Sequence, residues 1–154
     1  IYIMIKTKIF FGNDHAGENL KIYLINRLEN EYKNKYIIKD FGCNNQNKAD
    51  FPIYAEKVCK SITVKPLNCE PSEIGVVICG SGIGMSIACN RYKHIRCALC
   101  YNTEMGKLSR NHNNSNVLAL GARFITPEEA FNILDEYLNN FFLGSKYLDR
   151  LKLI

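Results

Sequence analysis

Short apolar runs alternate along this chain with longer segments in which apolar residues recur every three or four positions. An unbroken run of Val and Ile predicts a strand buried on both faces, and the wider spacing predicts a helix with one buried side. Strands are expected near residues 8–12, 36–40, 74–79, 96–100 and 117–120. Because strands and helices alternate, we expect a three-layer α/β/α, Rossmann-like fold with a five-stranded parallel sheet and a C-terminal helical tail.

Apolar stripes mark the helices between these strands. The first stripe consists of Leu20, Leu24 and Leu28, and further helices are expected after Ile83 and after Thr103. A second stripe consists of Ala55, Val58, Cys59 and Ile62.

The segment from Thr126 carries the clearest helix start. Thr126 can cap the helix, Pro127 has no N–H to leave unpaired, and Glu129 completes a capping box. Segments 43–48 and 63–72 are polar or contain proline and are expected to be irregular loops. The residues of the Thr126 helix expected to face the core are Phe131, Leu134, Leu138 and Phe141.

The length, charge and cysteine content of the chain limit the classes of function that the protein can have. A chain of 154 residues with 47% hydrophobic content fits one domain, residues 1–154, with residues 1–6 as an N-terminal extension. The net charge of +5 comes from scattered lysines, so we expect no nucleic-acid partner, whereas a polyanionic small molecule fits. Seven cysteines indicate reduced thiols in the cytosol, and no run has the length of a membrane span.

The most informative segment is residues 74–85, where an apolar strand ends at Cys79 and alternate glycines follow. Gly80, Gly82 and Gly84 have no Cβ, so an anion can approach the main-chain N–H groups. Open α/β sheets place their chemistry at the carboxyl ends of the strands, where Cys79 is expected. A cysteine in a buried strand is often structural, but amides at a helix N-terminus favour the thiolate and would make Cys79 a general base.

Three further polar clusters are expected beside Cys79 at the same carboxyl edge of the sheet. Asp14 and His15 follow the first strand; Asp14 alone could be a helix cap, whereas His15 beside it favours a phosphate partner. His112, in the polar segment 109–116, could serve acid–base chemistry or be an exposed residue at a helix end. The last cluster consists of Arg123, Lys146 and Arg150.

The spacing within the last cluster also points to an anion. Lys146 and Arg150 are four residues apart and would share a helix face, where like charges repel unless an anion lies between them. For Lys146, Arg150 and Arg123 alike, a solvated surface charge is the plain alternative.

Several known binding and catalytic motifs are excluded because the chain lacks residues that they require. The glycine segment lacks the Lys of a P-loop, and its GxGxG pattern is not the GxGxxG of dinucleotide folds, so no nucleotide cofactor is expected. A cysteine phosphatase would need an Arg where Met85 stands. Cys97 and Cys100 have CxxC spacing, but residues three apart in a strand face opposite ways and no second pair offers zinc ligands, so no metal site is expected.

Five segments, in order and spacing over nearly the whole chain, resemble type B ribose-5-phosphate isomerase, a family that also contains galactose- and allose-6-phosphate isomerases. They are residues 13–17 (NDHAG), 50–52 (DFP), 79–88 (CGSGIGMSIA), 109–113 (SRNHN) and 116–123 (NVLALGAR). The resemblance implies a step of the pentose phosphate pathway, the interconversion of ribose 5-phosphate and ribulose 5-phosphate through an enediolate, without metal or other cofactor. It also implies a homodimer, or a dimer of dimers, whose sites include residues of both subunits.

The same resemblance assigns roles to single residues. Cys79 would move the proton between C1 and C2, His112 with Asp14 would open the furanose ring, and Asn113 would bind sugar hydroxyls. Oxygen of the enediolate would be held by the Ser81 hydroxyl and by the amides of Gly80, Ser81, Gly82, Ile83 and Gly84. The phosphate ligands would be His15, Arg123, Lys146 and Arg150.

The chain departs from the family pattern at a few positions. The family usually has Tyr where Phe51 stands, some relatives have Glu at Met85, and the tail usually has Arg and His where Lys146 and Tyr147 stand. Lysine keeps the charge but loses the two-pronged hydrogen bonding of a guanidinium. Two alternatives therefore stay open: an isomerase of six-carbon sugar phosphates, and a non-catalytic module that binds a sugar phosphate.

Overall fold

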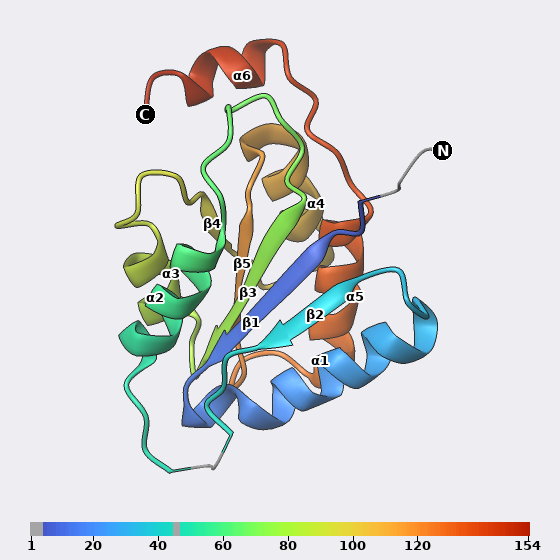
Figure 1. The fold of residues 1–154 in the computed structure, drawn as a ribbon, viewed down its shortest axis with the longest axis vertical. Helices are drawn as coiled ribbons and strands as arrows, with labels where there is room; N and C mark the ends of the chain where they lie inside the picture. The colour runs from blue at the N-terminus through green and yellow to red at the C-terminus, as the bar shows by residue number, and fades with distance from the viewer. Residues whose placement is uncertain (1–4, 45–46) are drawn as a thin grey trace.

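The computed structural model describes residues 5–44 and 47–154, so the expected extension at residues 1–6 and the loop at 43–48 fall partly outside the described residues. All the predicted strands are confirmed as one parallel sheet in the order β2-β1-β3-β5-β4 (Figure 1). Their bounds are β1 Lys8–Asn13, β2 Ile37–Asp40, β3 Glu73–Cys79, β4 Cys97–Leu99 and β5 Val117–Gly121.

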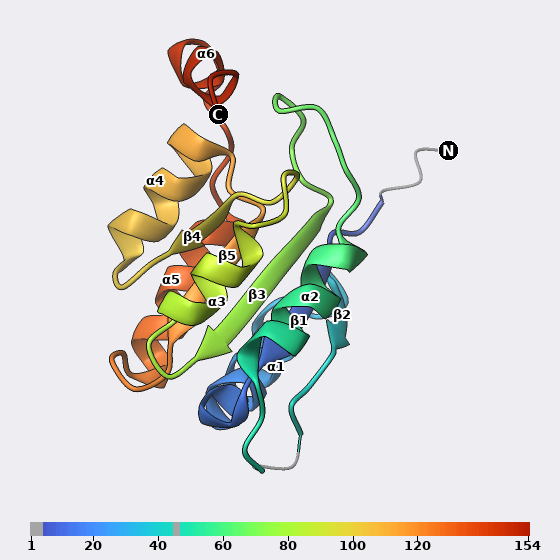
Figure 2. The same cartoon turned by 90° about the vertical axis from the view of Figure 1, so that its left-hand side faces the viewer.

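Helices cover both faces of the sheet, as the alternating pattern predicts. Figure 2 shows α2 and α3 lying along one face, whereas α1 and α5 cover the other and α4 packs on α5. In the described ranges, none of the helices has the length and apolar composition that a membrane span needs. The bounds are η1 His15–Gly17 (a 3-10 turn), α1 Glu18–Glu31, α2 Phe51–Ser61, α3 Ile83–Cys89, α4 Thr103–Asn113, α5 Pro127–Leu138 and α6 Lys146–Leu151.

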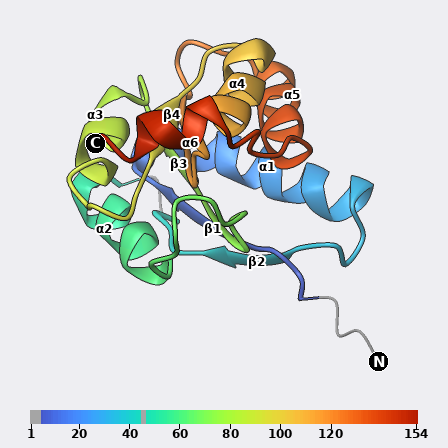
Figure 3. The ribbon, with the colours of Figure 1, turned by 90° about the horizontal axis from the view of Figure 1, so that it is seen from above.

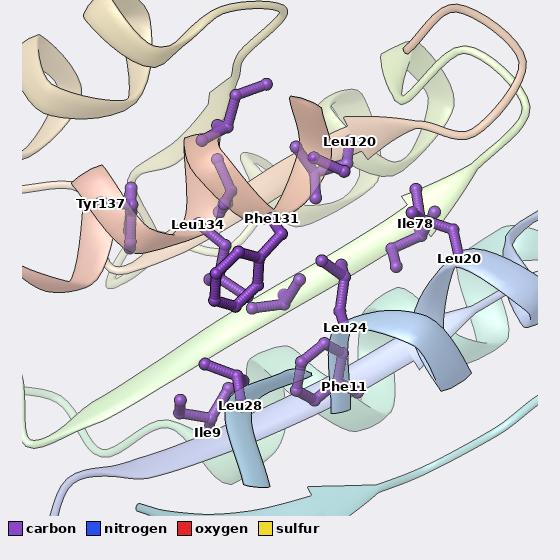
Figure 4. Packing of buried hydrophobic residues seen from close by; sticks show 14 of the residues in the cluster. Ile9, Phe11, Leu20, Leu24, Leu28, Ile78, Leu120, Phe131, Leu134 and Tyr137 are labelled. Carbon is purple, nitrogen blue, oxygen red and sulfur yellow. The ribbon is translucent and has the colours of Figure 1, made fainter. Parts of the chain in front are cut away.

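Strand β3 divides the core into two layers because its side chains alternate between the faces of the sheet. Val76 and Ile78 pack with the stripes of α1 and α5, whereas Val77 and Cys79 pack with α2 and α3. Figure 4 shows the first layer, including the leucine stripe of α1. This buried strand is what holds Cys79 at the edge of the sheet.

The capping box at Thr126 is confirmed. The Thr126 side chain accepts the Glu129 N–H at 3.2 Å, and the Glu129 carboxylate accepts the Thr126 N–H at 2.7 Å. Phe131 and Leu134 are buried, as expected. The prediction for Phe141 is wrong: its side chain is 67% exposed, because α5 already ends at Leu138 and the chain leaves the core there.

Candidate active site

The polar clusters lie at two opposite edges of the sheet. Asp14, His15, Cys79 and Arg123 follow the carboxyl ends of β1, β3 and β5, as expected. His112 lies at the last turn of α4, which runs antiparallel to the strands and returns the chain to the start of β5.

The tail reaches the same amino edge, because α6 lies over the amino ends of the strands (Figures 1 and 3). The expectation that all clusters share the carboxyl edge is therefore wrong for His112, Asn113, Lys146 and Arg150. The error has a simple topological cause: a polar segment that precedes a parallel strand lies at that strand's amino end, opposite to a segment that follows it.

The carboxyl-edge half-site is a cavity of about 330 Å³. Its lining residues come from the residue after β1, from α2, β3 and the turn after β5, and from the glycine loop (residues 80–84, which include the start of α3), so segments distant in the sequence meet there. They are Asp14, Phe51, Cys79, Gly80, Ser81, Gly84, Arg123 and Phe124.

Cys79 ends β3 with its side chain only 5% exposed, yet it lines this cavity. Its Sγ accepts the Gly82 N–H at 3.1 Å. This amide orients the sulfur and interacts favourably with negative charge that develops on it. The thiol therefore has one side against the protein core and one toward the cavity.

Two positions of the glycine loop require glycine, one for its backbone conformation and one for the close approach of a side chain. Gly82 has φ +77°, a left-handed conformation that glycine adopts without strain, and a Cβ at Gly80 would lie 3.0 Å from Arg123 Nη1. The Tyr101 hydroxyl donates to the Ser81 carbonyl oxygen at 2.5 Å. Glycine at position 80 thus lets the guanidinium of Arg123 lie directly against the loop.

Two of the amides expected to hold an oxyanion have partners within the loop. The Gly82 N–H donates to Cys79 Sγ, and the Ile83 N–H donates to Ser81 Oγ at 3.2 Å. Gly84 is the second residue of α3, where an N–H has no acceptor within the helix. Among the amides of α3, that of Gly84 is therefore a better placed donor than that of Ile83.

Asp14 and His15 follow β1. The Asp14 carboxylate accepts the Ala16 N–H at 2.9 Å, which confirms the helix-cap reading, but the residue also lines the cavity. His15 Nδ1 accepts the Ala49 N–H at 3.2 Å, which assigns the ring proton to Nε2. His15 therefore has one N–H donor left for a ligand.

Sequence reasoning missed an ion pair near the end of β1, in which the lysine is buried and the carboxylate is partly exposed. Lys21, 1% exposed, places its Nζ 3.0 Å from Asp40 Oδ2 and donates to the Cys43 carbonyl oxygen at 3.2 Å. Asn13 Nδ2 donates to the carbonyl oxygens of Cys43 and Asp14, both at 2.9 Å. These contacts attach the loop after β2 to α1 and to the end of β1. The only sequence signal is that Lys21 directly follows Leu20 in the buried stripe of α1.

The amino-edge half-site is built around Tyr147, a second residue that sequence reasoning treated only as a departure. The imidazole of His112 stacks on the Tyr147 ring with centroids 4.1 Å apart and planes 10° apart. Lys146 Nζ lies 5.3 Å and Arg150 Cζ 5.7 Å from the centroid of the same ring. The adjoining cavity of about 310 Å³ is lined by His112, Asn113, Tyr147, Arg150, Leu151 and Ile154.

The segment that carries α6 is attached to α4 by polar contacts. Glu70 pairs with the buried guanidinium of Arg110 at 2.5 Å and accepts the Phe142 N–H at 2.6 Å. Asn111 donates to the Phe141 carbonyl oxygen at 2.7 Å and accepts the Leu143 N–H at 3.0 Å. These contacts place the tail next to the end of α4.

Three cations of the two half-sites have no carboxylate partner within residues 5–44 and 47–154: Arg123, Lys146 and Arg150. All three are exposed, so the plain reading as solvated charges stays open for each. Arg123 and Arg150 line the two cavities, and a cation without an internal counter-ion at a cavity suits a phosphate group.

A larger cavity, of about 740 Å³, adjoins the amino-edge half-site and shares Asn113, Leu151 and Ile154 with it. Cys97 lines this cavity and packs on the α2–α3 layer, whereas Cys100 belongs to the core layer on the other face of the sheet. The prediction that these two thiols face opposite ways is confirmed.

Several known proteins are similar to this chain in sequence and fold over nearly its whole length. The sheet order and helical layers match a solved ribose 5-phosphate isomerase B from Anaplasma phagocytophilum (36% identity, TM-score 0.85, 99% of each chain). They also match one from Mycoplasma genitalium with bound ribulose-5-phosphate (31%, TM-score 0.81, 96% of this chain and 93% of that chain). A protein of Rickettsia conorii with the provisional name of sugar phosphate isomerase is 40% identical over 146 residues, 95% of this chain and 96% of its own length.

The fold is thus that of the Rossmann-like sugar-phosphate isomerases. Residues 9–154 match the family described as Ribose/Galactose Isomerase. The chain belongs to this family.

Proposed function

We propose that the chain interconverts ribose 5-phosphate and ribulose 5-phosphate, with Cys79 as the base. The observation that carries the proposal is the position of Cys79, whose sulfur lies at a cavity and beside the amide of Gly82. The Mycoplasma genitalium relative with bound ribulose-5-phosphate supports a five-carbon substrate. A cytoplasmic location and a place in the pentose phosphate pathway belong to the same proposal.

The reaction starts from the cyclic sugar. His112, with Asp14, removes the proton of the C1 hydroxyl and protonates the ring oxygen as the C1–O bond breaks, which leaves the open-chain aldehyde. The Cys79 thiolate then takes the proton from C2, and the electron pair moves into an enediolate. Return of the proton from sulfur to C1, with transfer of the hydroxyl proton from O2 to O1, gives the ketose.

Negative charge on the enediolate oxygen needs donors that are already in place. The Ser81 hydroxyl and the amides of Gly80, Ser81 and Gly84 supply them, whereas those of Gly82 and Ile83 have partners within the loop. Removal of one such donor typically slows a reaction by about a hundredfold or more. His15, Arg123, Lys146 and Arg150 hold the phosphate. This scheme assigns no role to a metal, so a chelator should leave the rate unchanged.

The separation of the half-sites supports a homodimer. Cys79 and His112 lie at opposite edges of one sheet, so a single copy cannot offer both to one small sugar phosphate. In a two-fold dimer, the carboxyl edge of one protomer can face the amino edge of its partner, and the symmetry then makes two equivalent sites.

Cys79→Ala tests the role of the base. We expect loss of isomerisation and of deuterium exchange at C1 of ribulose 5-phosphate in D2O, with calorimetric binding of ribose 5-phosphate changed by no more than about a few fold, because the base acts only in the transition state. The exposed Cys69 gives a matched control: Cys69→Ala should behave as the native chain. Full turnover by Cys79→Ala would refute the assignment.

A six-carbon sugar phosphate is the second candidate, because lysine at position 146 changes how the phosphate is held. A comparison of kcat/KM for ribose 5-phosphate, allose 6-phosphate and galactose 6-phosphate separates the two. Binding of all three without turnover would favour a non-catalytic module instead.

A further inference from the structure

His112 differs from the other two histidines of the chain in how its ring is held. His15 Nδ1 accepts the Ala49 N–H, and His94 Nε2 bonds to the Cys59 carbonyl oxygen at 2.9 Å. For His112, no ring nitrogen has a hydrogen-bond partner in the part of the chain that the structure describes; its contact is the stacked ring of Tyr147. The plane of this imidazole is therefore set by stacking rather than by a hydrogen bond.

Stacking suits the chemistry proposed for His112. A histidine that is oriented through a hydrogen bond uses one nitrogen for its support and keeps one for the substrate. Ring opening takes a proton from the C1 hydroxyl and delivers a proton to the ring oxygen. An imidazole held only through its face keeps both nitrogens available for these two transfers.

The same tyrosine ring also contacts the cations of the tail. Lys146 Nζ and Arg150 Cζ lie within the range in which a ring face attracts a cation. The Tyr147 ring thus contacts the imidazole and both proposed phosphate ligands, so its position bears on the spacing of all three groups.

We propose that Tyr147 is the positioning residue of the amino-edge half-site: its ring fixes the imidazole of His112 for ring opening and sets the distance from that imidazole to Lys146 and Arg150. This inference rests on the proposed role of His112. It gives a physical reason for tyrosine at this position, because an aromatic six-membered ring offers a broad face to both the imidazole and the cations.

Tyr147→Leu removes the ring but keeps a strong helix former in α6, and Tyr147→Phe keeps the ring. With ribose 5-phosphate, we expect Tyr147→Leu to lower kcat by about ten- to hundredfold, as for a misplaced catalytic group, and to raise KM by a smaller factor. Tyr147→Phe should stay within about twofold of the native kcat, since the stack is kept. Asp149→Ala, on the same helix but outside the stack, is the matched control for helix damage.

Deuterium exchange at C1 of ribulose 5-phosphate separates positioning from general damage. That exchange needs Cys79 but no ring opening, so Tyr147→Leu should retain it within about a few fold while losing turnover of the cyclic aldose. In proton NMR, the imidazole resonances of His112, assigned with His112→Asn, should move downfield in Tyr147→Leu, because the ring current of the stacked tyrosine is lost.

Three results would overturn the inference: native kcat in Tyr147→Leu, equal loss in Tyr147→Phe and Tyr147→Leu, or parallel loss of exchange and turnover. Failure of the proposed function looks different. In that case the native chain itself shows neither isomerisation nor exchange, and the inference falls with it.

Discussion

If each site combines the carboxyl edge of one protomer with the amino edge of its partner, the distribution of two substitutions over the two chains decides activity. We consider heterodimers obtained by co-expression with two affinity tags. In the trans heterodimer, one chain carries Cys79→Ala and the other His112→Asn. In the cis heterodimer, one chain carries both substitutions and the other is native.

The expected activities follow from the opposite placement of Cys79 and His112. In the trans heterodimer, the native Cys79 of one chain meets the native His112 of the other at one site, while the second site has neither, so about half of the native kcat per dimer is expected. In the cis heterodimer, every site lacks one of the two groups, so the turnover of ribose 5-phosphate should fall to the level of the single variants.

The assay is ribose 5-phosphate turnover by tandem-purified heterodimers, with both parent homodimers as blanks. KM of the trans heterodimer should equal the native value, since its one working site is complete. The reverse pattern, a half-active cis form and an inactive trans form, would show that each site lies within one chain and would refute the shared-site reasoning.

Further predictions concern binding and stability. Lys146→Ala should raise KM for ribose 5-phosphate by about tenfold or more through loss of a charged hydrogen bond, with Lys146→Arg restoring it; an unchanged KM would remove Lys146 from the phosphate site. Lys21→Met removes the buried ammonium from the Cys43 carbonyl oxygen and from the partly exposed Asp40 carboxylate and should lower the urea-derived free energy of unfolding by about 1–2 kcal/mol; an unchanged free energy of unfolding would contradict the pairing. Burial and a hydrogen bond to Asp135 raise the pKa of Tyr32 from 10.0 to about 12. Because the folded state holds the Tyr32 proton more tightly, the contribution of this shift to the free energy of unfolding is complete below pH 10 and is lost as the pH rises toward 12. In Tyr32→Phe, the free energy of unfolding should fall less steeply between pH 10 and 12, and the same pH dependence in both proteins would contradict the shift.

The sheet and its main helices were predictable because their signals are local. The Val and Ile run of β3, the leucine stripe of α1 and the cap at Thr126 each depend on residues that are close in sequence. The end of α5 could not be predicted, because the apolar spacing is the same for Leu138, which packs on the core, and for Phe141, which is exposed.

The site was predictable only in part. Cys79 and its loop follow from a strand that ends in glycines, but the side of the sheet on which His112 lies depends on the direction of α4. Burial of Lys21 and the stack of Tyr147 on His112 are tertiary contacts, with partners 19 and 35 residues away in the sequence. No local pattern encodes such pairs.

The division of the chemistry between two edges has a consequence for regulation by assembly. Cys79, Asp14 and the oxyanion donors belong to the carboxyl edge, whereas His112 and two phosphate ligands belong to the amino edge. Each half-site is built on its own elements and is formed in a single chain. Dissociation of a dimer would therefore abolish turnover of the cyclic sugar without unfolding either protomer, and activity lost on dilution would return on concentration.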